Sequence, residues 1–144
     1  MGADFTPSES LGHWAARLSW AARGALERRL KPLGVTPPMM AALLAIHAGA
    51  ERGADVAEHM GVDAAAVTRL MDRLHEAGLI GRCDMEGDRR SRKLSLSPQA
   101  LALLPKLQKA AAELDQRLAE GLNGAQKKEL MQTLKRLSEK ADAL

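Results

Sequence analysis

The turns between residues 54 and 97 constrain the fold more than any other feature of the chain. A short helical segment over residues 54–60 is followed by Gly61, the residue type that most easily adopts the left-handed backbone of a tight turn. Asp63 is a candidate N-cap for a second helix over residues 64–77, which ends before Gly78. Two short helices on either side of a glycine turn indicate a helix-turn-helix unit.

The second of these helices is amphipathic. Its apolar face carries Val67, Leu70, Met71 and Leu74, and its polar face carries Thr68, Arg69, Asp72 and Arg73. The alanines at its start allow close approach to a DNA major groove, which is wide enough for one helix. We therefore expect DNA contacts from Ala64, Ala65, Ala66, Thr68, Arg69 and Arg73. The other interpretation is that these arginines are the solvated face of an ordinary amphipathic helix.

Residues 79–97 change from a helical to an alternating pattern. Leu94 and Leu96 alternate with polar residues after a polar, glycine-containing segment at 84–88, so we expect a two-stranded hairpin. Four basic residues lie within five positions of this hairpin, where side chains can reach a DNA minor groove: Arg89, Arg90, Arg92 and Lys93. Residues 53–97 hold seven basic and eight acidic residues, so attraction to DNA depends on where the charges lie.

Composition narrows the function classes. The 144 residues suffice for one domain, and the formal net charge is only +3. Aromatic residues make up 2% of the chain and tyrosine is absent, which disfavours proteins that stack single-stranded nucleic acid on aromatic rings. The sequence shows neither an apolar stretch long enough to span a membrane nor the layout of a secretory signal, so we expect a cytoplasmic protein. It also lacks a phosphate-binding loop and a nucleophile elbow, so we expect neither an enzyme nor a cofactor.

Helical patterns flank the helix-turn-helix on both sides. Ser8 or Ser10 is a candidate cap for a first helix, Thr36 with Pro37 begins a second, and Ser97 with Pro98 begins a long one. Apolar residues recur at steps of three and four in the first and last helices: Leu11, Trp14, Leu18, Leu130, Leu134 and Leu137. We expect these stripes to be buried between two chains, with packing inside one chain as the alternative.

Several of these segments together resemble the MarR family of regulators. They are residues 56–62, 67–74, 78–80, 88–90 and 94–97, and the resemblance extends over nearly the whole chain. It implies a mainly α fold with a small β-hairpin wing, in which the first and last helices intertwine in a homodimer. It also implies that Asp88 and Arg90 brace the wing, leaving Arg89 or Arg92 to reach the minor groove. Many members of the family release DNA on binding a phenolic or lipophilic ligand, or on oxidation.

The resemblance and the residue patterns give one prediction for the whole chain. We expect a single MarR-like domain over residues 1–144, with the winged helix-turn-helix at about 36–97 and dimerisation helices at about 8–32 and 98–144. The predicted function is sequence-specific recognition of double-stranded DNA, by a homodimeric repressor on a pseudo-palindromic operator. The alternative is a winged-helix module that binds proteins and has no operator.

Two further predictions concern ligands. Seven residues on the first two helices are candidates for an effector site: His13, Trp14, Arg17, Trp20, Met40, Leu44 and His47. They could form an apolar pocket with an arginine for a carboxylate or phenolate. The alternative is that they are ordinary core residues. Cys83 lies on a predicted strand, where we expect a small buried thiol more than a redox switch. The four histidines show no close pair at metal-ligand spacing, so we expect no dedicated metal site.

Overall fold

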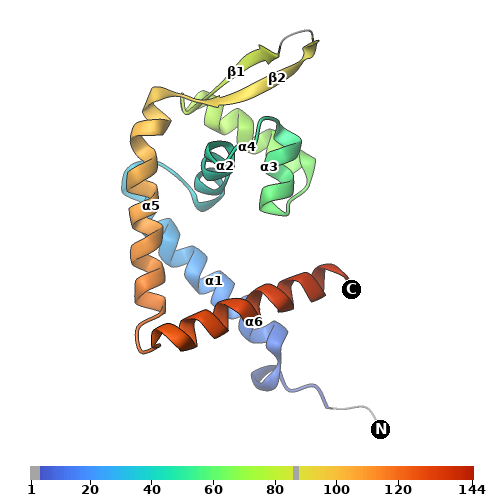
Figure 1. The fold of residues 1–144 in the computed structure, drawn as a ribbon, viewed down its shortest axis with the longest axis vertical. Helices are drawn as coiled ribbons and strands as arrows, with labels where there is room; N and C mark the ends of the chain where they lie inside the picture. Colours follow the sequence, from blue (N-terminus) through green and yellow to red (C-terminus); the bar gives the residue numbers. More distant parts are fainter. Residues whose placement is uncertain (1–3, 86–87) are drawn as a thin grey trace. The chain divides into compact units, whose positions relative to one another are not determined.

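The computed structural model describes residues 4–85 and 88–144, and the side chains of all of these except 84–92. The helices are α1 (Leu11–Leu30), α2 (Pro37–His47), α3 (Gly53–Met60), α4 (Ala64–Glu76), α5 (Pro98–Leu118) and α6 (Gly124–Asp142). One antiparallel hairpin, β1 (Ile80–Met85) and β2 (Asp88–Leu96), lies between α4 and α5 (Figure 1). Short 3-10 turns occupy Pro7–Glu9 and Lys31–Leu33. The predicted fold class, mainly α with a hairpin wing, is confirmed.

Local capping chemistry explains where most helices begin. Before every helix except α3, a polar side chain accepts a hydrogen bond from the backbone N–H three residues further on, which satisfies an otherwise unpaired donor. The accepting residues are Ser10 (3.3 Å), Thr36 (3.3 Å), Asp63 (2.8 Å), Ser97 (3.1 Å) and Asn123 (2.9 Å). Ser10, Thr36, Asp63 and Ser97 were candidate caps in the sequence, and for the first helix Ser10 is the cap.

The start of α3 follows a different solution. No Ser or Thr precedes this helix, and Arg52 occupies the N-cap position. Asp55, in the first turn, accepts from the backbone N–H of Arg52 at 2.9 Å and from that of Glu51 at 3.1 Å. The acidic side chain inside the helix therefore fixes the segment that leads into it.

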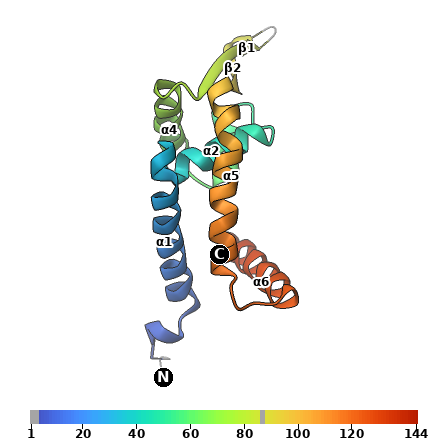
Figure 2. The same cartoon turned by 90° about the vertical axis from the view of Figure 1, so that its left-hand side faces the viewer.

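The chain divides into two compact units, residues 1–111 and 112–144. The first unit contains the main core, built from the end of α1, from α2, α3, α4, the base of the hairpin and the first half of α5. Its largest fully buried side chains are Leu30, Leu43, Val56, Leu74 and Leu107. In the second unit, none of the residues of α6 is buried. Figures 1 and 2 show that α2, α3 and α4 lie together in the first unit and that the hairpin extends from them.

The register of the hairpin places its side chains on two faces. Arg82 pairs with Leu94, and Cys83 pairs with Lys93. Because successive residues of a strand point to opposite faces, Cys83 and buried Leu94 lie on opposite sides of the sheet. Cys83 is exposed, so the expectation of a buried thiol was wrong.

Candidate nucleic-acid interface

The exposed face of α4 presents most of the residues predicted to contact DNA. Ala64, Ala65, Thr68, Arg69 and Arg73 are exposed, and Ala66 is partly buried. The opposite face buries Val67, Leu70, Met71 and Leu74 in the core, which confirms the predicted division of the helix. The helix is held by its apolar face and leaves two guanidinium groups and a row of small side chains facing outward.

Thr68 is partly committed to its own helix. Its hydroxyl donates to the carbonyl oxygen of Ala64 at 3.0 Å. The hydroxyl oxygen can still accept a hydrogen bond, and the methyl group remains for apolar contact. This combination suits an amino group or a thymine methyl on a base edge.

Three arginines and an apolar wall form a hollow beside α4. The hollow has a volume of about 570 Å³, and Arg69 and Arg73 share it with Arg23 from α1. Its other lining residues are largely apolar: Pro37, Pro38, Ala41, Met60, Val62, Ala66 and Leu70. Arg23 is not among the predicted DNA contacts, because nothing in its local pattern marks it as a neighbour of residues that lie far along the chain. Chemically, the hollow suits an anion with an apolar body.

Ion pairs join both strands of the hairpin to the helix-turn-helix. Arg82 of β1 lies 3.9 Å from Asp72 of α4. Lys93 of β2 lies 3.0 Å from Glu51, which precedes α3. The backbone N–H of Leu94 also donates to the carbonyl oxygen of Glu51 at 2.7 Å. The segment before α3 therefore pairs with the outer edge of the hairpin.

The distal part of the wing carries the remaining predicted contacts. Arg89, Arg90 and Arg92, with the proposed brace of Asp88 and Arg90, have side chains outside the described residues. Their backbone belongs to β2, as the hairpin prediction requires. The DNA contacts of the arginines and the bracing role of Asp88 stay predictions.

The apolar stripes outside the helix-turn-helix are exposed in the single chain. On α1, Leu11 is 74% exposed and Trp14 is 54% exposed, and Leu18 is similarly open. On α6, Leu130, Leu134 and Leu137 are each at least 40% exposed. Each stripe is an apolar surface of the kind that commonly marks a protein contact.

The residues predicted for an effector pocket occupy different environments. Trp14 donates through Nε1 to the carbonyl oxygen of Ser8 at 2.8 Å, and the Arg17 guanidinium lies 5.6 Å from the centre of its ring. His13 meets the same ring edge-on, at 5.5 Å between ring centres. Trp20 is 83% exposed and Met40 is buried in the core. Leu44 lines a hollow of about 460 Å³ between α2 and α3, and His47 is exposed at the end of α2.

Among the described side chains, those of residues 4–83 and 93–144, no group of three or more His, Cys, Asp or Glu has the geometry to hold a metal ion. Within the same part of the chain, no helix has both the length and the apolar character that crossing a membrane requires.

Comparison with known proteins places this geometry in context. Residues 33–91 match the sequence profile of the MarR family. Bordetella bronchiseptica BpsR, whose DNA binding is regulated by 6-hydroxynicotinic acid, is similar over 94% of this chain and 98% of its own, with 23% identity and a TM-score of 0.85. A cysteine-to-serine mutant of Escherichia coli MarR, solved with operator DNA, is similar over 94% and 99%, with 23% identity and a TM-score of 0.83. Mycobacterium tuberculosis Rv2887, a MarR-family protein solved with salicylic acid, covers 94% and 99%, with 25% identity and a TM-score of 0.74.

Proposed function

Because this chain belongs to the MarR family of winged-helix regulators, we propose that it binds a specific operator in double-stranded DNA as a homodimeric repressor. The observation that carries the proposal is the outward face of α4, where exposed Arg69 and Arg73 stand on a helix whose other face is locked into the core. A rigid helix of this kind can enter a major groove and present its side chains to base edges.

Each α4 helix would read one half-site. Arg69 and Arg73 would bind guanine edges or phosphates, Thr68 would contact a base edge, and Ala64 and Ala65 would allow the helix to approach the groove. Arg89, Arg90 and Arg92 of the wing would add minor-groove and phosphate contacts on the flanking DNA. Occupancy of the duplex would suffice to block transcription, which is why repression is the role we propose.

Dimerisation would supply the second half-site. The exposed stripes at Leu11, Trp14 and Leu18 and at Leu130, Leu134 and Leu137 support burial against a second chain. A two-fold dimer places two recognition helices about one helical turn apart on the same face of DNA, and this spacing matches a pseudo-palindromic operator.

An anionic effector with an apolar body would regulate this binding. The hollow bounded by Arg23, Arg69 and Arg73 supports such a ligand better than the predicted group on α1 and α2, whose tryptophans are exposed. DNA binding by BpsR is regulated by 6-hydroxynicotinic acid, and Rv2887 was solved with salicylic acid. Both ligands are aromatic acids. A carboxylate in this hollow would occupy the same guanidinium groups that DNA needs, so ligand and operator would compete.

A salt titration tests the DNA-binding proposal. Binding to the DNA that flanks the gene for this protein would be measured by fluorescence anisotropy, with Arg69→Ala and Arg89→Ala in parallel and a scrambled duplex as control. We expect site-selective binding that weakens in both variants and whose salt dependence is less steep in any variant that lost a phosphate contact. Equal, weak binding to both duplexes would reject the operator and favour a protein-binding module.

The same assay tests the effector. Salicylic acid and 6-hydroxynicotinic acid are suitable probes because both combine a ring with an acidic group. We expect at least one to release the operator from the wild-type protein and to act less strongly on Arg23→Ala, which leaves the α4 arginines in place. No release by either probe would contradict an aromatic-acid effector, while the operator proposal would stand.

A further inference from the structure

Glu51 makes two contacts to the wing from outside it. Its backbone carbonyl oxygen accepts from the Leu94 N–H at 2.7 Å, and its carboxylate Oε1 lies 3.0 Å from Lys93 Nζ. The two wing residues are adjacent on β2, so one residue holds both the backbone and a side chain of this strand. Glu51 lies far from Lys93 in the sequence, so local pattern could not reveal the contact.

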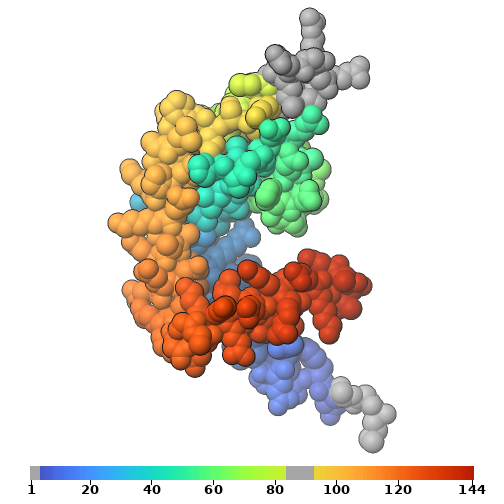
Figure 3. Space-filling model, viewed as in Figure 1, coloured from blue at the N-terminus to red at the C-terminus, as the bar shows by residue number. Residues whose placement is uncertain are grey.

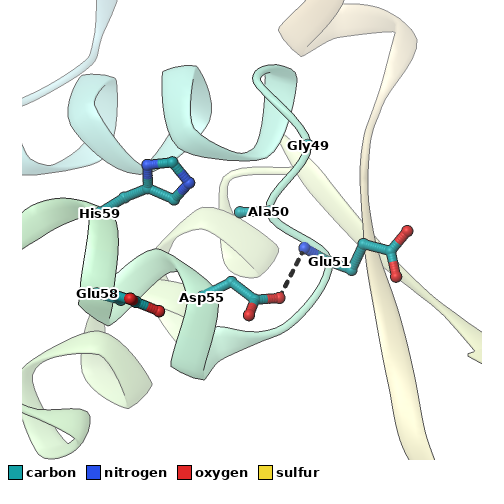
Figure 4. A pocket seen from close by; sticks show the side chains of 6 residues that line it. All are labelled: Gly49, Ala50, Glu51, Asp55, Glu58 and His59. Atoms are coloured by element: carbon teal, nitrogen blue, oxygen red, sulfur yellow. Dashed lines mark hydrogen bonds between the residues drawn. The ribbon is translucent and has the colours of Figure 1, made fainter.

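The segment that carries Glu51 is itself fixed. The Asp55 carboxylate accepts from the Glu51 N–H at 3.1 Å, a bond that Figure 4 shows, and from the Arg52 N–H at 2.9 Å. Ala50, just before it, is buried and donates its N–H to the carbonyl oxygen of Ala45 at 3.0 Å. Figure 4 also shows the Glu51 side chain directed away from Asp55, on the side where β2 passes. A continuous series of bonds thus connects the first turn of α3 to the wing.

The ion pair changes what Lys93 can do for DNA binding. Both side chains are about half exposed, so the pair lies at the surface of the molecule. Figure 3 shows the described part of the hairpin, in yellow, next to the teal and green segments of α2 and α3. A lysine that neutralises a phosphate releases condensed counterions, and this release appears as a steeper salt dependence. The Glu51 carboxylate places a compensating negative charge 3.0 Å from this lysine, so the closed pair is neutral as a unit and contributes little to that exchange.

We propose that Glu51 is a positioning residue that fixes the wing on the helix-turn-helix and neutralises Lys93, so that Lys93 braces the wing and does not bind phosphate. This rests on the proposed function, because it concerns how the wing meets DNA. It also revises the role predicted for Lys93 from the sequence. The phosphate contacts of the wing would then come from Arg89, Arg90 and Arg92.

The central test compares salt slopes of operator binding for Glu51→Gln and for the double variant Glu51→Gln/Lys93→Gln. In the single variant Lys93 is free to reach a phosphate, so the slope of log K against log salt steepens by about 0.9. In the double variant the slope returns to the wild-type value, because the pair has lost both of its charges. Glu58→Gln is the matched control. Glu58 is exposed and lines the hollow of Figure 4 together with Glu51 and Asp55, and among the described side chains it forms no ion pair with a lysine.

Two results would overturn the proposal. If Lys93 binds phosphate in the wild-type complex, Glu51→Gln leaves the slope unchanged and the double variant lowers it by about 0.9. If Glu58→Gln steepens the slope as much as Glu51→Gln does, the effect comes from general charge and not from the pair.

A measurement on the free protein separates this proposal from the proposed function. Hydrogen exchange at the Leu94 amide, followed by NMR, should be faster in Glu51→Gln and in Lys93→Gln than in the wild-type protein, and unchanged in Glu58→Gln. If no variant binds an operator but Leu94 exchange responds in this way, the DNA function fails and the bracing role of Glu51 stands. If the operator is bound but Glu51→Gln changes neither the salt slope nor the Leu94 exchange rate, the bracing role fails and the proposed function stands.

Discussion

Apolar residues are buried in the region of the helix-turn-helix but exposed in the first half of α1 and in α6, the helices at the two ends of the chain. In α2, α3 and α4, residues such as Leu43, Val56 and Leu74 are completely buried within one chain. In the first half of α1 and in α6, residues such as Leu11 and Leu134 are exposed despite the same three- and four-residue spacing. The difference teaches that one region folds on its own contacts, whereas the others present surfaces that a second chain can cover.

The largest effect is expected where the core is completed within one chain. Leu43→Ala removes a fully buried side chain and should lower the free energy of unfolding by about 2–5 kcal/mol. Urea unfolding followed by circular dichroism measures this loss. Leu144→Ala, at the exposed end of the chain, is the matched control and should change little. A loss for Leu43→Ala as small as that of the control would break the distinction between the two regions.

The second prediction concerns α6. Leu134→Ala should weaken dimerisation by roughly 2–4 kcal/mol, about 30-fold to almost 1,000-fold, because a two-fold interface loses the side chain twice. Sedimentation equilibrium measures the dissociation constant. Lys135→Ala removes a neighbouring exposed side chain and serves as the control. An unchanged dimerisation constant would mean that the α6 stripe has another partner.

A third prediction separates binding from folding inside the helix-turn-helix. Arg73→Ala should weaken operator binding by about 1–3 kcal/mol while changing unfolding little, because the residue is exposed. Anisotropy and thermal unfolding would be measured on the same samples. Arg117→Ala is the control, since Arg117 is an exposed arginine of α5 that pairs with Glu120 at 3.3 Å. Equal binding losses in both variants would indicate a general charge effect.

The smallest effect is expected at the start of α4. Asp63→Ala removes the side chain that accepts from the Ala66 N–H and should cost about 0.5–2 kcal/mol of stability. Asp63→Asn keeps an acceptor oxygen and should retain most of that stability. Thermal unfolding distinguishes the two. An equal loss in both variants would show that the carboxylate charge near the helix N-terminus matters more than the cap.

The sequence predicted what depends on neighbouring residues. Ser10, Thr36, Asp63 and Ser97 cap helices because a short polar side chain in the N-cap position reaches the backbone N–H three residues further on. The two faces of α4 followed from helical periodicity in the same way.

The sequence did not predict features that depend on strand register or on contacts between distant parts of the chain. The side of the hairpin on which Cys83 lies depends on its pairing with Lys93, and a one-residue slip would have reversed it. The contact of Glu51 with Lys93 and the place of Arg23 beside α4 depend on how separate elements pack. For the same reason, the aromatic residues chosen for a pocket on α1 gave a local cluster around Trp14.

The central claim is that two chains place two α4 helices on one face of a DNA duplex. Hydroxyl-radical footprinting of the DNA that flanks the gene tests it most directly. The account predicts two protected segments whose centres lie about one helical turn apart, roughly 10 base pairs, with both lost together in Leu134→Ala below its dimerisation concentration. A single protected segment that persists in that variant, or no protection at all, would contradict it.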